Sequence, residues 1–471
     1  MNQPRKTKIV ATIGPASDDP RVLGNIIAAG LNVARLNFSH GDHASHQKTI
    51  GLVRRLAREQ GRTVAILQDL AGPKIRLGEL PEPIRLEAGR EVALAPGATA
   101  GPGVLPVDYA GLLDDVAPGQ RILLADGMVE LEVVRVAGGQ VRAMVKVGGE
   151  ISSRKGVNLP TSELGISSFT AKDQRDLEMG LAAGVDLVAL SFVRHEKDLA
   201  PVRERLNHVE DPPLLVAKIE KPQAVERLHE IMAAVDGVMV ARGDLGVEMP
   251  LEEVPLIQKR IIAEARRAGK VVVTATQMLR SMMDNPRPTR AEAADVANAV
   301  LDGTDAVMLS DETAMGAYPV ESVAMMDRLC RATEDHVNSE TLLKEELSPL
   351  LPAVAAALSR AACWLARDLK PAAIVASTTS GGTARLISRY RPEATFVGLT
   401  PDPSTCRQLA LSWGVVPALV EPFQDTEQMA QRARRWMLES GLAQPGEHII
   451  LTGGVPVGTP GTTNILKVLE L

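Results

Sequence analysis

The feature that most constrains this chain is a series of eight short, β-branched runs, each followed by a stretch of helical character. Parallel strands that alternate with crossover helices look like this in sequence, because both faces of such strands are covered. Several helical stretches, including 19–29, 252–268 and 289–301, end at or near a glycine, as helix C-caps often do. Eight such units predict a (β/α)8 TIM barrel. The runs occupy residues 8–13, 32–38, 64–70, 186–193, 214–220, 237–244, 271–277 and 305–310.

The regular spacing breaks over residues 72–160, between the third and fourth runs. Short alternating runs are separated there by turn signals, such as the Pro-Gly pairs at 96–97 and 118–119 and the glycine pair at 138–139. This pattern predicts a small all-β, barrel-like insert. Because the insert follows the third strand, we expect it to hang over the C-terminal face of the barrel and to act as a lid.

The pattern restarts after about residue 340 with a helix over 353–369. Strand, loop and helix alternation follows, and it fits an open α/β sheet better than more barrel. The sequence therefore predicts three domains: a discontinuous barrel of residues 1–71 and 161–338, the lid of 72–160, and a C-terminal domain of 339–471. The predicted C-terminal strands are 373–377, 395–399, 415–420, 448–452 and 464–469.

Charge and composition exclude several classes of protein. The formal net charge is −6 and aromatic residues make up 2%, so a nucleic-acid binder's basic surface and stacking platforms are both missing. No segment approaches the roughly 18 apolar residues of a membrane helix, and the first apolar run is too short for a signal peptide. The three cysteines are widely spaced, which argues against a zinc site or a disulfide framework. We expect a cytoplasmic enzyme acting on small molecules, with neither nucleic acid nor membrane as a partner.

Polar residues gather at the carboxyl ends of six of the eight runs. In a closed barrel these ends share one mouth. Any one of these residues is equally well explained as a solvated strand end, but the whole set is not. The set consists of Arg35, Asn37, Ser39, Asp69, Lys218, Glu220, Arg242, Asp244, Thr276, Ser310 and Glu312.

Lys218 carries most of this argument. Its neighbours in the run are apolar, so its ammonium group must lose water and needs a carboxylate partner or an anionic ligand. Glu220 and Asp244 offer hard oxygen ligands suited to Mg²⁺ or Mn²⁺. Cations together with an oxygen-bound Mg²⁺ in a lidded cleft suit phosphoryl transfer. The residues therefore favour an anionic, phosphorylated substrate.

Nine segments of the chain resemble the pyruvate kinase family. The resemblance covers the barrel, the insert and the C-terminal domain in the family's order. It implies a glycolytic reaction in which phosphoenolpyruvate, ADP and a proton give pyruvate and ATP, and it implies a homotetramer. The segments are TKIVATIGPAS (7–17), ARLNFSHG (34–41), QDLAGPKIR (68–76), KGVNLP (155–160), AKIEK (217–221), VARGDLGV (240–247), ATQML (275–279), PTRAE (288–292) and AVLDGTDAVMLS (299–310).

The resemblance assigns roles to these residues. Arg35 would hold the phosphate of phosphoenolpyruvate, and Lys218 would stabilise the transferring phosphoryl group and the enolate left behind. Glu220 and Asp244 would bind Mg²⁺ or Mn²⁺. The remaining assignments are the backbone of Ala241, Arg242 and Gly243 beside the substrate carboxylate, Thr276 and Ser310 in the network that protonates enolpyruvate, and Asn37, Arg76 and Lys155 as nucleotide contacts.

The pocket for a monovalent cation departs from the family. Potassium-dependent members resembling this chain carry Glu where it has Lys74 and Thr where it has Leu70, next to the cation-binding Asn37, Ser39 and Asp69. An ammonium group in that pocket supplies the positive charge that K⁺ otherwise brings. We therefore expect an enzyme that does not require K⁺.

A second segment suited to binding phosphate, a run of Ser, Thr and Gly at residues 377–383, lies in the C-terminal domain. The run follows a strand and opens a helix, an arrangement that binds phosphate, although a bare Ser/Thr/Gly run is more often a turn with an N-cap. In the family this loop binds a phosphorylated effector. The facing loop, 453–463, has no Arg or Lys, so we expect activation by a sugar monophosphate or AMP rather than by fructose 1,6-bisphosphate. The predicted phosphate contacts are Ser377, Thr378, Thr379, Ser380, Gly381 and Thr383.

Two other functions remain open at this stage. A barrel lyase or aldolase acting on phosphoenolpyruvate or pyruvate would share Glu220 and Asp244 but gives no reason for a lid with Arg76 and Lys155. A catalytically silent sensor that kept only the effector domain predicts damage at the mouth of the barrel, where the residues are intact. The histidines at 40, 43 and 46 do not share one helix face, which argues against a metal site there.

Overall fold

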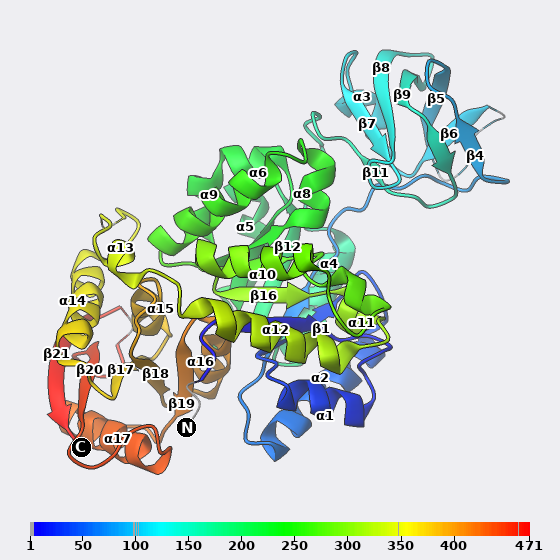
Figure 1. The fold of residues 1–471 in the computed structure, drawn as a ribbon. Helices are drawn as coiled ribbons and strands as arrows, with labels where there is room; N and C mark the ends of the chain where they lie inside the picture. The colour runs from blue at the N-terminus through cyan, green and yellow to red at the C-terminus, as the bar shows by residue number, and fades with distance from the viewer. Residues whose placement is uncertain (1–3, 98, 100, 102, 347, 460) are drawn as a thin grey trace.

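The computed structural model describes residues 4–97, 99, 101, 103–346, 348–459 and 461–471. Eight parallel strands close into a barrel in the order β1-β16-β15-β14-β13-β12-β3-β2. The predicted (β/α)8 barrel is confirmed (Figure 1). Its strands are β1 (Lys8–Thr12), β2 (Val33–Asn37), β3 (Ala65–Asp69), β12 (Leu187–Val193), β13 (Leu214–Ile219), β14 (Gly237–Ala241), β15 (Val271–Ala275) and β16 (Ala306–Leu309).

Helices and short connecting turns surround the barrel (Figure 1). Asp19, Thr170 and Thr289 cap three of the helices by accepting hydrogen bonds from first-turn N–H groups. The helices are α1 (Pro20–Ala28), α2 (His43–Glu59), α4 (Ala171–Ala182), α5 (Ala200–Leu206), α6 (Pro222–Glu226), α7 (Leu228–Ala234), α8 (Arg242–Glu248), α9 (Val254–Arg267), α10 (Arg290–Asp302), α11 (Asp311–Ala314) and α12 (Pro319–Glu334), with 3₁₀ turns at Glu196–Asp198 and Arg280–Met283.

The core has two layers because successive strand residues point to opposite faces. In β1, Val10 packs inside the barrel, whereas Ile9 and Ala11 pack between the strands and the helices. The inner cluster also contains Ala410 and Leu411, which belong to the C-terminal domain. The amino end of the barrel is therefore closed by a neighbouring domain, and the carboxyl end is left for chemistry.

The lid stands away from the barrel at the carboxyl ends of the strands (Figure 1). The predicted barrel-like closure does not hold for the described part of the lid, because its strands form one six-stranded and one two-stranded sheet around their own core. The strands are β4 (Ile84–Leu86), β5 (Glu91–Pro96), β6 (Val104–Val107), β7 (Arg121–Leu124), β8 (Val129–Ala137), β9 (Gln140–Val147), β10 (Gly149–Ile151) and β11 (Val157–Asn158), and one short helix, α3 (Leu112–Asp115), joins them.

The C-terminal domain is an open five-stranded sheet in the order β19-β18-β17-β20-β21, as the sequence predicted. Among the described strands of this sheet, β21 alone runs antiparallel to its neighbour. The elements are α13 (Ser339–Leu343), α14 (Ala353–Leu369), β17 (Ala373–Ser377), α15 (Gly382–Ser388), β18 (Thr395–Thr400), α16 (Pro403–Gln408), the 3₁₀ turn Leu409–Leu411, β19 (Val415–Leu419), α17 (Thr426–Glu439), β20 (His448–Gly454) and β21 (Thr463–Glu470).

Two strand ends differ from the prediction. The strand expected over 237–244 stops at Ala241, and Arg242 begins helix α8. The strand expected to reach residue 277 stops at Ala275, because Thr276 and Gln277 have positive φ angles of 68° and 56°. Left-handed backbone at two non-glycine residues is strained and gathers at functional sites.

Candidate active site

A buried lysine stands at the centre of the barrel mouth. The Nζ atom of Lys218 lies 2.8 Å from Glu220 Oε1 and 3.4 Å from Asp69 Oδ1, and it donates to Ser191 Oγ at 2.8 Å. Burial opposes the charge of Lys218, but Asp69, Glu220 and Asp244 outweigh burial and raise its pKa above the ordinary value. Lys218 is therefore a permanently protonated, fixed cation.

Arg35 completes the same cluster from β2. Its Nε donates to Asp69 Oδ2 at 2.7 Å, and its Nη1 donates to Thr12 Oγ1 at 2.8 Å. Burial opposes the ionisation of Asp69, yet Lys218 and Arg35 lower its pKa below the ordinary value. One buried carboxylate thus orients two cations, and both predicted phosphate contacts are held in place before a substrate arrives.

The two predicted metal ligands come from different elements. Glu220 is buried directly after β13, and its Oε2 accepts the N–H of Phe192 at 2.7 Å. Asp244 lies in the first turn of α8. Burial raises the pKa of Glu220, with Asp244 adding to the rise and Lys218 opposing it. Two carboxylates without a third protein ligand suit Mg²⁺, which normally keeps water and takes substrate phosphate oxygens.

No group of three or more His, Cys, Asp or Glu side chains in the described ranges could hold a metal ion by itself. The donor set of Glu220 and Asp244 therefore fits an ion whose coordination is completed by the substrate. It does not fit a closed structural zinc site.

Thr276 is held where the strained backbone places it. Its Oγ1 accepts the N–H of Gly243 at 2.7 Å and donates to the carbonyl oxygen of Ala275 at 2.7 Å. The first turn of α8 is thereby tied to the end of β15. Thr276 therefore lies beside the turn that carries Ala241, Gly243 and Asp244, since Ala241 also pairs with Ala275 across the two strands.

The side chain of Arg242 corrects the sequence prediction. Its guanidinium binds Asp295 Oδ1 on α10 at 2.7 Å and donates to the carbonyl oxygen of Thr276 at 2.7 Å. These partners neutralise the charge, so Arg242 does not join the cations that face the mouth. The reason is the early end of β14, because a residue that begins a helix no longer follows the strand's alternation.

Ser310 ends β16 with an uncommitted hydroxyl. Its N–H donates to Glu312 Oε2 at 2.7 Å, and the other oxygen of Glu312 accepts the N–H of Leu279 at 3.0 Å. The Oγ of Ser310 is buried and has no hydrogen-bond partner among the described residues. Glu312 is therefore a structural carboxylate, and Ser310 keeps a free hydroxyl.

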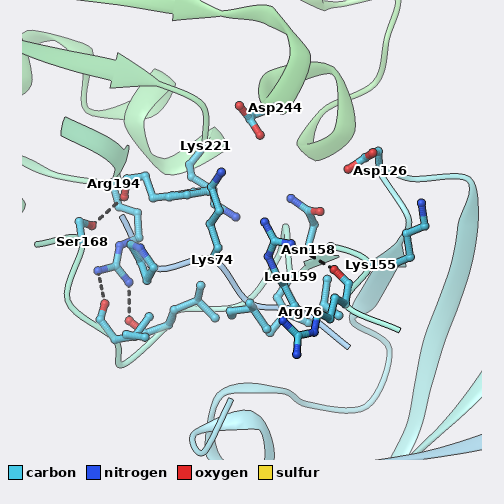
Figure 2. Close-up of a pocket in the computed structure, with 18 residues that line it drawn as sticks. Lys74, Arg76, Asp126, Lys155, Asn158, Leu159, Ser168, Arg194, Lys221 and Asp244 are labelled. Carbon is cyan, nitrogen blue, oxygen red and sulfur yellow. Dashed lines mark hydrogen bonds between the residues drawn. The ribbon is translucent and has the colours of Figure 1, made fainter. Parts of the chain in front are cut away.

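A cleft of about 350 Å³ separates the lid from the barrel. Figure 2 shows Arg76, Lys155 and Asn158 of the lid side facing Lys221 and Asp244 of the barrel. Lys218 and Arg35 do not line this cleft; Asp244 borders both the cleft and the Lys218 cluster. The cleft lies next to the cluster, so a second anionic substrate would approach the metal ligands from the lid side.

A lid contact that the sequence did not reveal supports this arrangement. Asn158 Nδ2 donates to Glu248 Oε1 at 2.7 Å, and Lys221 forms a buried ion pair with the same oxygen. Lys221 directly follows Glu220, and Glu248 is the last residue of α8, the helix whose first turn carries Asp244. The pair therefore fastens together the two elements that carry the metal ligands. The sequence held one signal for this contact. Each residue of the pair lies close to a predicted metal ligand, with Lys221 one position after Glu220 and Glu248 four positions after Asp244.

The predicted monovalent-cation pocket is only partly assembled. Asn37 Oδ1 accepts the N–H of Ser39 at 3.1 Å, and Leu70 is fully buried. Lys74 lines the cleft and makes no hydrogen bond or ion pair within the described ranges. Burial, Lys218 and Arg76 lower the pKa of Lys74.

The predicted effector loop lines a separate cavity of about 180 Å³ in the C-terminal domain. The hydroxyls of Thr383 and Thr463 lie 2.6 Å apart and join this loop to the facing one. Gly381 is not among the lining residues; its φ of 78° instead makes the turn into α15. None of the described lining residues is charged.

A closed barrel with buried cations and carboxylates at its mouth, beneath a lid, defines an enzyme that acts on an anionic substrate. Comparison with protein families matches residues 4–323 to the pyruvate kinase barrel domain and 356–469 to the pyruvate kinase alpha/beta domain. The chain therefore belongs to the pyruvate kinase family, and it is a phosphotransferase.

Individual relatives agree with the family match. The chain is 44% identical to a pyruvate kinase of Geobacillus stearothermophilus, over 98% of this chain and 80% of that protein. It is 41% identical to a pyruvate kinase of Clostridium acetobutylicum, over 98% and 99%. A crystal structure of a pyruvate kinase from Cryptosporidium parvum superimposes with a TM-score of 0.93 at 36% identity, covering 99% of this chain and 96% of that one.

Proposed function

We propose that this enzyme transfers the phosphoryl group of phosphoenolpyruvate to ADP, giving pyruvate and ATP in glycolysis. The observation that carries the proposal is the buried cluster of Lys218, Arg35 and Asp69 beside Glu220. Its cations are fixed and desolvated, which is how phosphoryl transfer is catalysed, by positioning and charge neutralisation.

Arg35 and Lys218 would hold the phosphoryl oxygens of phosphoenolpyruvate, and the backbone of Ala241, Arg242 and Gly243 would lie beside its carboxylate. The bond between phosphorus and the enol oxygen breaks, and a bond from phosphorus to an ADP β-phosphate oxygen forms. Lys218 stabilises the enolate oxygen left behind. When bound by Glu220 and Asp244, Mg²⁺ or Mn²⁺ supplies positive charge to the phosphate oxygens.

The enolate then takes a proton at carbon. We assign that proton's path to the hydroxyls of Thr276 and Ser310, because the Oγ of Ser310 is buried and uncommitted while Thr276 lies beside the first turn of α8. Nucleotide phosphates would be met by Arg76 and Lys155, which line the cleft from the lid side. Asn37, which does not line the cleft, would contact them from the barrel, as the resemblance to the family implies. Closure of the lid would exclude water from the transferring group.

Activity without K⁺ is part of the proposal and rests on Lys74. Its ammonium group lies near Asp69 and Asp244 and has no committed partner in the described chain. It would replace the monovalent cation beside Asn37, Ser39, Asp69 and Leu70.

Activation by a sugar monophosphate or AMP is supported by the neutral C-terminal cavity. Ser377, Thr378, Thr379, Ser380 and Thr383 line it with hydroxyls, whereas a second phosphate would meet no positive charge among the described lining residues. The homotetramer and the cytoplasmic location rest on the resemblance to the family. No helix in the part of the chain that the structure describes is long and apolar enough to cross a membrane.

A coupled assay tests the whole proposal. Pyruvate formation should require phosphoenolpyruvate, ADP and Mg²⁺ together, and it should proceed at full rate when a large organic cation replaces K⁺. Pyruvate formed without ADP would instead identify a lyase. In the same assay, a sugar monophosphate or AMP should lower the phosphoenolpyruvate concentration needed for half-maximal rate more than fructose 1,6-bisphosphate does.

A further inference from the structure

A second concentration of positive charge lies at the opposite end of the barrel, where the C-terminal domain meets the amino ends of the strands. A small cavity there is bordered by α15 and by residues at the starts of β15 and β16. Asp305 is the only carboxylate among the described residues that line it. Five cationic side chains line the same cavity: Arg266, Lys270, Arg385, Arg389 and Arg391.

Two of these cations are already neutralised. Arg266 forms a two-pronged pair with Glu345, with N–O distances of 2.6 and 2.9 Å. Arg391 lies 3.2 Å from Asp305 Oδ2. Both oxygens of Asp305 also accept backbone N–H groups, so this carboxylate has little capacity left for another cation.

Two further cations have only neutral partners as hydrogen-bond acceptors. Lys270 donates to the carbonyl oxygen of Val235 at 2.6 Å, and Arg385 donates to that of Ser380 at 2.8 Å. The Nη1 atom of Arg385 is buried with no hydrogen-bond partner among the described residues. Asp236 is the carboxylate whose charge both of them feel.

Arg389 is, together with Arg391, the least exposed to solvent of the five cations. Its surface is only 2% accessible, and none of its three guanidinium nitrogens finds a hydrogen-bond acceptor in the described ranges. The ring of Tyr390, 4.8 Å from the guanidinium carbon, is a weak substitute for an anion. Burial lowers the pKa of Arg389, but an arginine stays charged in proteins.

A buried cation without a partner is strongly destabilising, and natural proteins pair such charges. We propose that this cavity binds one small inorganic anion, held by Arg389 and Arg385 between the barrel and the C-terminal domain. The cavity volume of about 10 Å³ leaves room for one occupant near the size of a water molecule. That size favours a halide such as chloride over a sugar phosphate.

The position of the site gives the anion a structural role. Helix α15 begins at the proposed effector loop and ends beside Arg389 and Arg391. An anion bound there would attach the end of this helix to the barrel through the guanidinium groups. It would therefore stabilise the contact between the two domains, in addition to neutralising charge.

Thermal unfolding in sodium chloride and in sodium gluconate at equal ionic strength and pH tests the proposal, because gluconate is too large for the cavity. The midpoint temperature of thermal unfolding of the wild-type protein should be about 2–4 °C higher in chloride than in gluconate. Arg389→Gln should abolish this difference, and in gluconate the variant should unfold at or above the wild-type temperature because it no longer buries an unpaired charge. Arg435→Gln, which alters an exposed arginine of α17, should behave as wild type.

A second anion and a second variant sharpen the experiment. Arg389→Lys keeps the charge and should keep part of the chloride effect. Thermal unfolding in phosphate in place of chloride distinguishes an oxyanion from a halide as the bound ion. Only the part of the phosphate effect that Arg389→Gln removes is assigned to this cavity. An equal chloride effect in wild type and Arg389→Gln would overturn the proposal. So would a change in oligomeric state of Arg389→Gln without any loss of the chloride effect, because a second copy would then supply the missing negative charge.

Discussion

The two ends of the barrel both bury positive charge, and they treat it in opposite ways. At the carboxyl end, Lys218 has two carboxylates within 3.4 Å and its pKa is raised. At the amino end, Lys8 donates to the carbonyl oxygen of Val415 and has no ion pair among the described residues, and burial lowers its pKa to about 7. Carboxylates at the mouth keep Lys218 charged, whereas at the base Lys8 loses its charge above about pH 7 because burial outweighs the carboxylates near it.

The difference shows what burial alone can and cannot do. Burial removes water from both lysines and disfavours their charged forms. Three carboxylates reverse that effect at Lys218: Glu220 just after its own strand, Asp69 at the end of β3, which β12 separates from that strand, and Asp244 on α8. A cation used in catalysis therefore requires carboxylates nearby, although its final partner is an anionic substrate.

The largest expected effect on catalysis comes from removing the charge of Lys218. Lys218→Met should lower kcat by at least about 10³, because the variant loses the charge that stabilises the transferring group. Steady-state kinetics with phosphoenolpyruvate and ADP measure this loss. Lys197→Met removes an exposed lysine of the barrel and should leave kcat unchanged. A loss of less than tenfold in Lys218→Met would contradict the role given to the mouth.

A smaller effect, on metal affinity, is expected from a residue that supports the metal ligands without binding the metal itself. Glu248→Gln breaks the buried pair with Lys221 and should weaken Mn²⁺ binding by about 10- to 100-fold, as loss of a residue that supports metal ligands does. Electron paramagnetic resonance of free Mn²⁺ measures this affinity without an assay of activity. Glu252→Gln, an exposed neighbour, should bind Mn²⁺ as the wild type does. Equal affinities in all three proteins would show that the pair does not position the ligands.

Reversing the charge of Lys74 should create a requirement that the wild type lacks. In Lys74→Glu, activity in a large organic cation should fall about tenfold, and K⁺ should restore it, because an unpaired carboxylate near Asp69 costs roughly one to two kcal/mol. Lys48→Glu, a reversal on the exposed surface of α2, should not respond to K⁺. A wild-type enzyme that already needs K⁺ would remove the basis of this prediction.

The last prediction concerns the stability of the fold and the buried lysine that has no carboxylate partner in the described chain, Lys8. Lys8 is neutral in the folded state above about pH 7 but protonated in the unfolded state up to its ordinary pKa of 10.5. The unfolded state therefore binds more protons in this window, so stability rises with pH, by up to about 1.4 kcal/mol per pH unit. Chemical unfolding between pH 7 and 10 should show a shallower rise in Lys8→Met. An identical slope would indicate that Lys8 is charged in the folded protein.

Much of the fold and site follows from local patterns. The eight strands were predictable because β-branched runs recur between helical stretches, and α14 and β17 match their predicted bounds. The alternation of Arg35 with apolar neighbours placed it in the mouth, and the apolar surroundings of Lys218 predicted its need for a carboxylate. These features depend on residues within a few positions of one another.

The features that sequence did not reveal depend on contacts between distant residues. Asn158 and Glu248 are 90 positions apart, and Ser191 reaches Lys218 from another strand. The direction of Arg242 was missed because the strand ends three residues earlier than predicted, and Asp295, its partner, lies 53 positions away. The left-handed backbone at Thr276 has no local signal, since glycine is absent there.

The closure of the barrel also sets an order for synthesis of the chain. The first strand of the barrel, β1, pairs with the last barrel strand, β16, across nearly 300 residues, in the register Lys8 to Ala306. The lid, in contrast, is continuous in sequence, and its described strand pairings all lie within residues 84–158. A ribosome therefore releases a complete lid long before the barrel that surrounds it in sequence can close. The lid is therefore able to fold first, whereas β1 cannot complete its pairing until β16 has been synthesised.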